Sequence, residues 1–203
     1  MRIDTLFPTR LYRGSLIGAR RLKPELVKTC LAIAREDIAG QRWCEENGYL
    51  GYTSYASLND LPSRASVFAE LARHLDSHAK HFAQALEWDL QGKRLTLDSL
   101  WINVMEQGSV HTGHIHPHSA ISGTYYVAVP HGASAIRFED PRLTMMMAAP
   151  TKRTAVRREN LTFVTVTPSA GAILMWESWL RHEVPPNHAR GNRISLSFNY
   201  TAY

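Results

Sequence analysis

The chain has 203 residues, of which 44% are hydrophobic, so it is long enough to bury the core of one domain. Its formal net charge is +5. Neither a run of about 18 uninterrupted apolar residues nor the apolar segment of a signal peptide is found, so we expect a cytoplasmic protein without a membrane span. Cys30 and Cys44 form no CxxC unit, which argues against a thiolate zinc site and predicts free thiols.

The N-terminal portion, residues 1–92, is predicted to be mainly helical. Residues 6–16, LFPTRLYRGSL, combine β-forming residues with a proline, which predicts an edge strand or an extended arm. In residues 23–40 the apolar side chains follow one helical stripe, with Pro24 near the start and Gly40 just past the end. Such termini are typical of a helix, so we expect the first helix here.

A loop and a second helix are expected next. Residues 43–62 are rich in Gly, Asn, Ser and Tyr and show no clear period, which predicts a long loop that could cover a site. Asp60 is expected to cap the following helix. From Pro62 to about Leu90 the apolar residues recur every three or four positions, as in a long amphipathic helix.

The remainder of the chain, residues 93–203, changes to short β-rich runs separated by Gly, Pro, Asn or His. Even spacing of such runs is typical of a sandwich or barrel made of two sheets. We therefore expect a single α+β domain over residues 1–203, with helices first and the β-structure second. The runs cover residues 95–108, 121–130, 134–140, 161–168, 171–177 and 193–200.

The segment HTGHIHPHS, residues 111–119, indicates a metal site. On a strand, His114 and His116 would point to one side and form half of a site for a divalent first-row metal. His182 is the best candidate for a third ligand, because an apolar strand precedes it. Pairing His116 with His118 instead stays open, although Pro117 disfavours a regular strand there.

A second group of residues indicates an anion site close to the metal. In the run RISLSFN, alternation places Arg193, Ser195 and Ser197 on one face of a strand. A guanidinium can bind a carboxylate with two parallel hydrogen bonds, so a buried arginine beside serines predicts a carboxylate pocket.

These motifs, in this order, resemble those of a known enzyme group. HIHPHSAISGTYYV, PSAGAILMW and LRHEVPPNHARGNRISLSFN, together with LFPTRLY near the start, are similar to a largely uncharacterised bacterial and phage family of 2-oxoglutarate/Fe(II)-dependent oxygenases. The resemblance implies a double-stranded β-helix, or jelly-roll barrel, and a dioxygenase of hydroxylase type that uses Fe(II) and 2-oxoglutarate. It says nothing of the substrate.

The resemblance also implies roles for individual residues. His114 matches the first iron ligand and His182 the distal histidine, while Arg193 matches the residue that binds the far carboxylate of 2-oxoglutarate. Tyr126 resembles a tyrosine that hydrogen-bonds the same carboxylate, and Ser195 fits the RxS pattern of some members.

One position departs from the usual superfamily motif, which is HxD. His116 stands where most members have aspartate, so three neutral ligands would leave Fe(II) with one less compensating negative charge. A site with two protein ligands is the alternative.

Other functions stay open on the sequence alone. They are a cupin-type metal enzyme, a non-catalytic metal- or sugar-binding jelly roll and, through the basic run at residues 152–158, nucleic-acid binding, for which no recognition motif is present. The substrate could be a small molecule or a protein, and a homodimer is compatible with the sequence. Trp101, Asn103, Val104 and residues 43–57 are expected to shape the substrate pocket.

Overall fold

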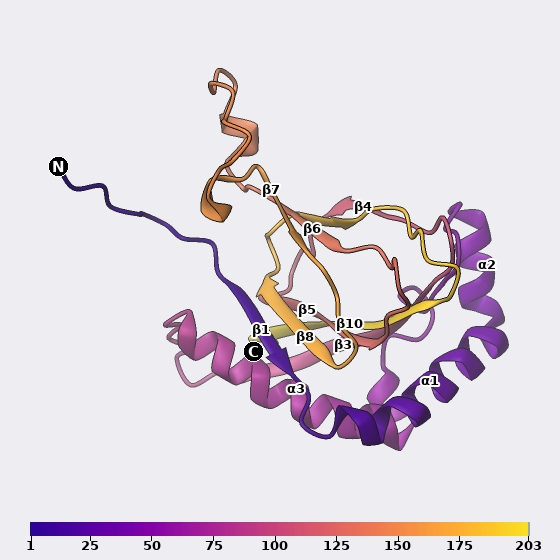
Figure 1. Cartoon of the computed structure of the whole chain (residues 1–203). Coiled ribbons are helices and arrows are strands. Elements are labelled where there is room, and N and C mark those ends of the chain that lie inside the picture. Colours follow the sequence, from indigo (N-terminus) through magenta and orange to yellow (C-terminus); the bar gives the residue numbers. More distant parts are fainter. Residues whose placement is uncertain (203) are drawn as a thin grey trace.

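Two antiparallel sheets face each other in the computed structural model, which describes residues 1–202 (Figure 1). The six-stranded sheet has the order β1-β8-β5-β10-β3-β2, and the four-stranded sheet has the order β4-β9-β6-β7. Every predicted β-rich run contains a strand. The strands are β1 Leu11–Ser15, β2 Tyr52–Thr53, β3 Leu95–Met105, β4 His111–His114, β5 Ile121–Ala128, β6 Ile136–Glu139, β7 Phe163–Val166, β8 Ala172–Glu177, β9 His182–Val184 and β10 Arg193–Ala202.

Helices α1 (Ala19–Glu36), α2 (Ile38–Glu46) and α3 (Ser66–Ala85) lie on the outer side of the six-stranded sheet (Figure 1). The buried apolar side chains of α1 and α3 pack with alternate residues of the central strands, among them Ile194, Leu196 and Phe198 of β10. The opposite face of β10 therefore points between the two sheets, as the alternation predicts. The expectation of an α+β chain with helices before a two-sheet β-structure is confirmed.

The first helical region differs from the prediction. A break at Asp37 separates α1 from α2, so Gly40 lies in the first turn of a second helix and not past the end of the first. The Asp37 side chain accepts the backbone N–H of Gly40 at 3.0 Å and caps this new helix. Pro24, predicted near the helix start, lies inside α1 because the helix begins at Ala19.

The expected loop over residues 43–62 is also shorter than predicted. Helix α2 continues to Glu46, and the same segment also contains strand β2, which pairs with β3. The next helix begins at Ser66 and not at Pro62. Asp60 does not cap a backbone N–H group with its side chain, because its carboxylate accepts hydrogen bonds from Ser63 and Arg64.

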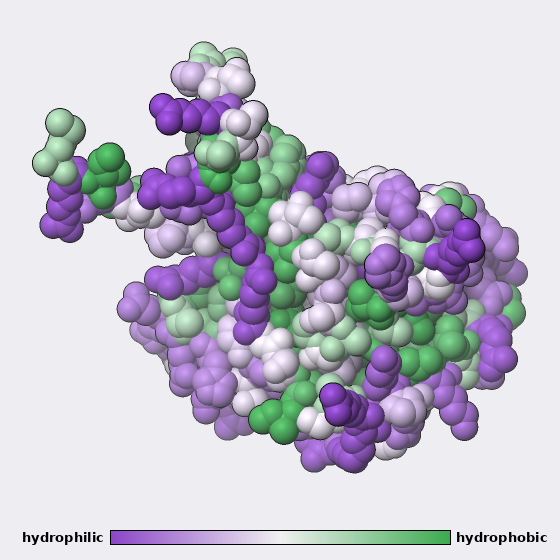
Figure 2. Space-filling view, viewed as in Figure 1, coloured by the Kyte–Doolittle hydropathy of each residue, from purple (hydrophilic) through white to green (hydrophobic). Residues whose placement is uncertain are grey.

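Two segments extend away from the sheets. Residues 1–10 form an extended arm that leads into the edge strand β1, which matches the prediction for this region (Figure 1). The arm exposes both apolar and hydrophilic side chains (Figure 2); the exposed large apolar ones are Met1, Ile3, Leu6 and Phe7. The β6–β7 connection, residues 140–162, projects on the same side and carries the basic run at residues 152–158 as a largely exposed segment. Within residues 1–202, no helix has the length and apolar character needed to cross a membrane.

Candidate metal centre

Three histidines, two from the end of β4 and the residues after it and one from β9, meet between the two sheets. His114 ends β4 and His182 begins β9, and these two residues are partners in the antiparallel β4–β9 pair. His116 follows β4, and its backbone N–H donates to the carbonyl oxygen of Ser178 at 3.1 Å. One ring nitrogen of each histidine lies within 4.8 Å of the others, so the three imidazoles can reach one ion.

The expected partners are therefore brought together, but not in the way predicted. His116 does not share a strand with His114, because β4 ends at His114. Pro117 has no N–H to donate to a strand partner, and His118 adopts a positive φ of 69°. His118 is exposed and lies outside the group of three, so the structure places His116 beside His114 and His182 and not beside His118.

The hydrogen bonds of the rings leave the same nitrogen free on each histidine. Nδ1 of His114 lies 2.7 Å from the carbonyl oxygen of Thr112, and Nδ1 of His182 lies 2.9 Å from that of Leu180. A carbonyl only accepts, so both Nδ1 atoms carry the proton and both Nε2 atoms have a free lone pair. His116 Nε2 is buried and has no hydrogen-bond partner among the described residues.

Burial keeps the imidazoles of His182 and His116 neutral. Loss of solvation, together with the neighbouring histidines, lowers the pKa of His182 to about 3 and that of His116 to about 4. Neutral imidazole is the form that binds a metal. Three imidazole nitrogens within reach of one point are therefore a donor set suited to a divalent first-row metal, and these residues fit an iron ion.

A buried arginine lies further along the same interior. Arg193 is 2% exposed, and its Nη1 lies 3.3 Å from Ser195 Oγ and 3.2 Å from the sulfur of Met105. Its guanidinium carbon is 5.0 Å from the centre of the Tyr126 ring. Within residues 1–202, neither Arg193 Nε nor the Tyr126 hydroxyl has a hydrogen-bond partner, and Arg193 forms no ion pair.

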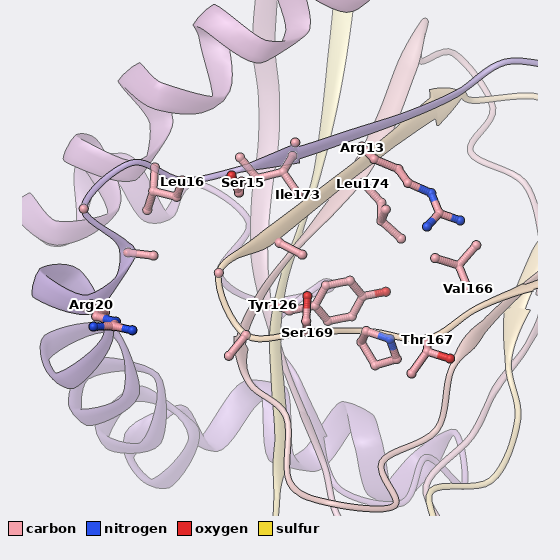
Figure 3. A pocket seen from close by; sticks show the side chains of 17 residues that line it. Arg13, Ser15, Leu16, Arg20, Tyr126, Val166, Thr167, Ser169, Ile173 and Leu174 are labelled. Atoms are coloured by element: carbon pink, nitrogen blue, oxygen red, sulfur yellow. The ribbon is translucent and has the colours of Figure 1, made fainter.

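A cavity of about 630 Å³ lies beside Tyr126, between β1, β8 and the segment that follows β7. In Figure 3 the Tyr126 ring lies near its centre, and Arg13 and Val166 lie on the side to which the hydroxyl points. The three histidines do not line this cavity. It therefore approaches the Tyr126 end of the barrel interior and not the candidate metal centre.

Trp101 and Asn103, which were expected to shape the substrate pocket, pair with Ser197 and Ser195 of β10 and do not line this cavity. Trp101 lies inside the barrel with its ring centre 5.8 Å from that of His116, and Asn103 accepts a hydrogen bond from Thr53 at 2.9 Å. Tyr55, from the predicted covering segment, packs edge-on against Trp101. Val104 was wrongly assigned to the pocket, because on β3 it alternates with its neighbours and belongs to the core under the helices.

Two residues of the site were missed. Asn199 accepts a hydrogen bond from Nδ1 of His116 at 2.8 Å, and the alternation that placed Arg193 inside would also have placed Asn199 there. Trp176 packs edge-on against His182, with 4.6 Å between ring centres, and its buried indole N–H has no partner among the described residues. From the sequence, Trp176 was predicted only to be part of an apolar strand.

Two facing antiparallel sheets with a histidine triad between them define a double-stranded β-helix protein with a candidate metal centre. A sequence profile of the family described as "Putative 2OG-Fe(II) oxygenase" matches residues 99–199, the strands that hold His114, His182 and Arg193. The chain belongs to this family of oxygenases, which depend on Fe(II) and 2-oxoglutarate. No match is found among curated proteins.

Solved structures share the fold over almost the whole chain. A prolyl-4-hydroxylase from Pseudomonas putida is 15% identical, with a TM-score of 0.62 over 96% of this chain and 94% of that one. The epimerase SnoN, solved with Fe3+, alpha ketoglutarate and nogalamycin RO, is 14% identical, with a TM-score of 0.65 over 95% of this chain and 79% of its own. HygX from Streptomyces hygroscopicus, solved with nickel and 2-oxoglutarate, is 13% identical, with a TM-score of 0.59 over 95% and 82%. The predicted double-stranded β-helix is thus confirmed.

Proposed function

We propose that this chain is a hydroxylase-type oxygenase whose Fe(II) is held by His114, His116 and His182. The observation that carries the proposal is the Nε2 atom of His116, which is buried without a partner and belongs to a group of ring nitrogens within 4.8 Å of one another. A buried polar atom without a partner costs about 1–3 kcal/mol, and a bound metal would remove that cost.

The same proposal assigns Arg193, Ser195 and Tyr126 to the far carboxylate of 2-oxoglutarate. Arg193 supplies a buried positive charge without a carboxylate partner among the described residues, and Tyr126 supplies a buried hydroxyl without a partner. Both features favour a carboxylate between them, because it would pair the charge and accept both hydrogen bonds. The nickel and 2-oxoglutarate of HygX, and the Fe3+ and alpha ketoglutarate of SnoN, support this assignment.

Bound Fe(II) with 2-oxoglutarate would supply the activation of oxygen for insertion into a C–H bond. The chain's own contribution is to position both groups and to exclude water. Phe138, Leu174 and Trp176 form part of the buried apolar cluster inside the barrel, so the interior is dry where the histidines and Arg193 face it. The neutral His116 in place of a carboxylate leaves more positive charge on the metal centre.

The substrate would enter beside Trp101 and Tyr55, because Tyr55 is 52% exposed and its partner Trp101 faces His116. An aromatic entrance suits a small molecule or a protein side chain with an apolar face. We assign the protein to the cytoplasm, where its two unpaired cysteines would stay reduced.

A titration of the anaerobic protein tests the function. Adding Fe(II) and then 2-oxoglutarate is expected to produce the weak visible charge-transfer band of the chelated complex, and oxygen is then expected to release succinate. His182→Ala should lose metal binding, because it removes one of three ligands. His118→Ala is the matched control, since His118 is exposed and lies outside the triad.

Two results would contradict the proposal. A metal-loaded wild-type protein without the band and without succinate would indicate a non-catalytic jelly roll. Full iron binding by His182→Ala would show that the metal lies elsewhere.

A further inference from the structure

The hydrogen bond between His116 and Asn199 joins the candidate ligand set to residues that the family comparison does not assign. Asn199 lies on the inner face of β10, is 7% exposed, and its Oδ1 is 2.8 Å from Nδ1 of His116. From this contact we infer that Asn199 is a positioning residue, which fixes the His116 tautomer and aims its Nε2 lone pair at the metal. This inference rests on the proposed metal site.

Both ends of the Asn199 amide are hydrogen-bonded to buried serine hydroxyls. Ser122 donates to Oδ1 of Asn199 at 2.8 Å, and the amide nitrogen donates to Ser99 Oγ at 3.2 Å. The Ser122 hydrogen is used in this bond, so the Ser178 hydroxyl, 2.8 Å away, donates to Ser122 in turn. All three serines are buried. In this arrangement the carbonyl end of the amide faces Nδ1 of His116.

A flipped amide would prevent metal binding by His116. With the Asn199 nitrogen facing Nδ1, that ring atom would have to accept, and the proton would move to Nε2, the atom that must coordinate. The flip would also place two acceptors together at Ser99 unless its hydroxyl turned. The observed orientation of the amide thus favours the Nδ1-protonated tautomer of His116 without contributing any net charge.

The neutral amide also limits the electron density on His116. In many metal sites a carboxylate behind the histidine raises the basicity of the ligand, and loss of such a partner costs 10- to 100-fold in metal affinity. In this protein both carboxylates are missing. His116 takes the place of the usual ligand aspartate, and the residue hydrogen-bonded to Nδ1 of His116 is an asparagine, Asn199. Asn199→Asp would keep both acceptor contacts and add one negative charge next to the ligand set.

Three variants separate positioning from general packing. Asn199→Leu is expected to weaken Co(II) binding by about 10- to 100-fold, and Asn199→Asp is expected to bind Co(II) at least as tightly as the wild type. Ser197→Ala is the matched control, because Ser197 is on the same face of β10 but bonds to Asn103 and not to a histidine. Its Co(II) affinity should equal that of the wild type. Affinities are measured by calorimetry and by the Co(II) absorption spectrum.

The tautomer is read independently of the metal. Nitrogen-15 NMR of the metal-free protein at pH 8 should show His116 protonated at Nδ1 in the wild type and in Asn199→Asp, and redistributed toward Nε2 in Asn199→Leu. If Asn199→Leu does not fold, Ser122→Ala replaces it and should shift tautomer and affinity in the same direction. A wild-type tautomer and affinity in these variants would overturn the inference. Absence of Co(II) binding by the wild type would instead overturn the metal site, while the NMR measurement would still test Asn199.

Discussion

The guanidinium of Arg193 is a buried positive charge in the barrel interior. Arg193 contacts a thioether, a hydroxyl and an aromatic ring, but no carboxylate among the described residues. An unpaired buried charge is strongly destabilising, and these contacts offset only part of that cost. In the proposed function, the carboxylate of 2-oxoglutarate supplies the negative charge that Arg193 lacks.

Replacement of Arg193 should separate cosubstrate binding from metal binding. We expect Arg193→Met to keep the metal, because the hydrogen bonds of Arg193 go to Met105 and Ser195 and not to the three histidines. It should lose about 1.5–3 kcal/mol of 2-oxoglutarate affinity, the contribution of a charged hydrogen bond. Urea unfolding of the ligand-free variant should show equal or higher stability, since the buried charge is gone. The measurement is a 2-oxoglutarate titration of the anaerobic Fe(II) protein.

The paired surface residue Arg142 provides the control for this experiment. It lies on the projecting β6–β7 connection with its charge balanced by Asp140, so Arg142→Met should leave 2-oxoglutarate affinity unchanged. Normal affinity in Arg193→Met would show that the carboxylate pocket is wrongly assigned.

At the scale of elements, the segment from α2 to β2 connects the helical layer to the barrel mouth. Its start depends on Asp37, whose carboxylate accepts hydrogen bonds from the Gly40 backbone and from the Tyr52 hydroxyl. Its end depends on Thr53, which pairs with Asn103 of β3. The Asp37 side chain thus fixes both the start of α2 and the position of β2, and the residues after β2 place Tyr55 against Trp101.

Loss of this cap should lower the stability of the whole segment. Asp37→Ala is expected to reduce the free energy of unfolding by about 1–2 kcal/mol, the usual value of an N-cap, while Asp37→Asn keeps an acceptor and should lose less. Asp98→Ala, at an exposed position of β3, is the control and should change stability by less than about 0.5 kcal/mol. Urea unfolding at pH 7 measures these values.

The same carboxylate gives this effect a defined pH dependence. Burial opposes ionisation of Asp37, but hydrogen bonds from Ser57, Gly40 and Tyr52 outweigh it and lower its pKa. The stabilisation is therefore present above the unfolded pKa of about 3.9 and is lost as the pH falls through the lower folded pKa. The difference between wild type and Asp37→Ala should shrink in acid, and a constant difference down to pH 2 would contradict this origin.

Local patterns explain which elements were predictable. Alternation along residues 193–202 correctly separated Arg193 and Ser195 from the core residues of β10, because the side-chain period of a strand is a local property. The break at Asp37 was not predictable from periodicity, since the apolar stripe continues close to it on both sides. The position of His116 also depends on tertiary structure, because its hydrogen bond to Asn199 spans 83 residues of sequence.

At the scale of the whole molecule, two apolar clusters lie on opposite faces of the six-stranded sheet. The larger one joins the helices to the outer face, and the smaller one fills the barrel around the site. The sequence predicted the elements that form both clusters but not which strands become neighbours. The order β1-β8-β5-β10-β3-β2 brings distant segments together, and no local pattern encodes those pairings.

The two buried cysteines lie in different parts of the fold, so their reactivity should report on the stability of each part. Cys30 belongs to the larger cluster, and burial raises its pKa to about 12. Cys44 is held at the α2–β2 contact, where its sulfur accepts the Thr53 N–H at 3.4 Å, and burial raises its pKa as well. A protonated, buried thiol does not react with a disulfide reagent at pH 8, so labelling requires opening of the fold.

Labelling kinetics in urea should therefore differ between the two sites. In Cys44→Ala, reaction of Cys30 requires disruption of the main core, so its rate should follow the urea dependence of global unfolding. In Cys30→Ala, reaction of Cys44 requires only separation of α2 from β2, so it should be faster in native buffer and depend less on urea. Equal rates with the full urea dependence would show that the α2–β2 segment unfolds only together with the barrel, and rapid labelling of Cys30 in native buffer would contradict its position in the core.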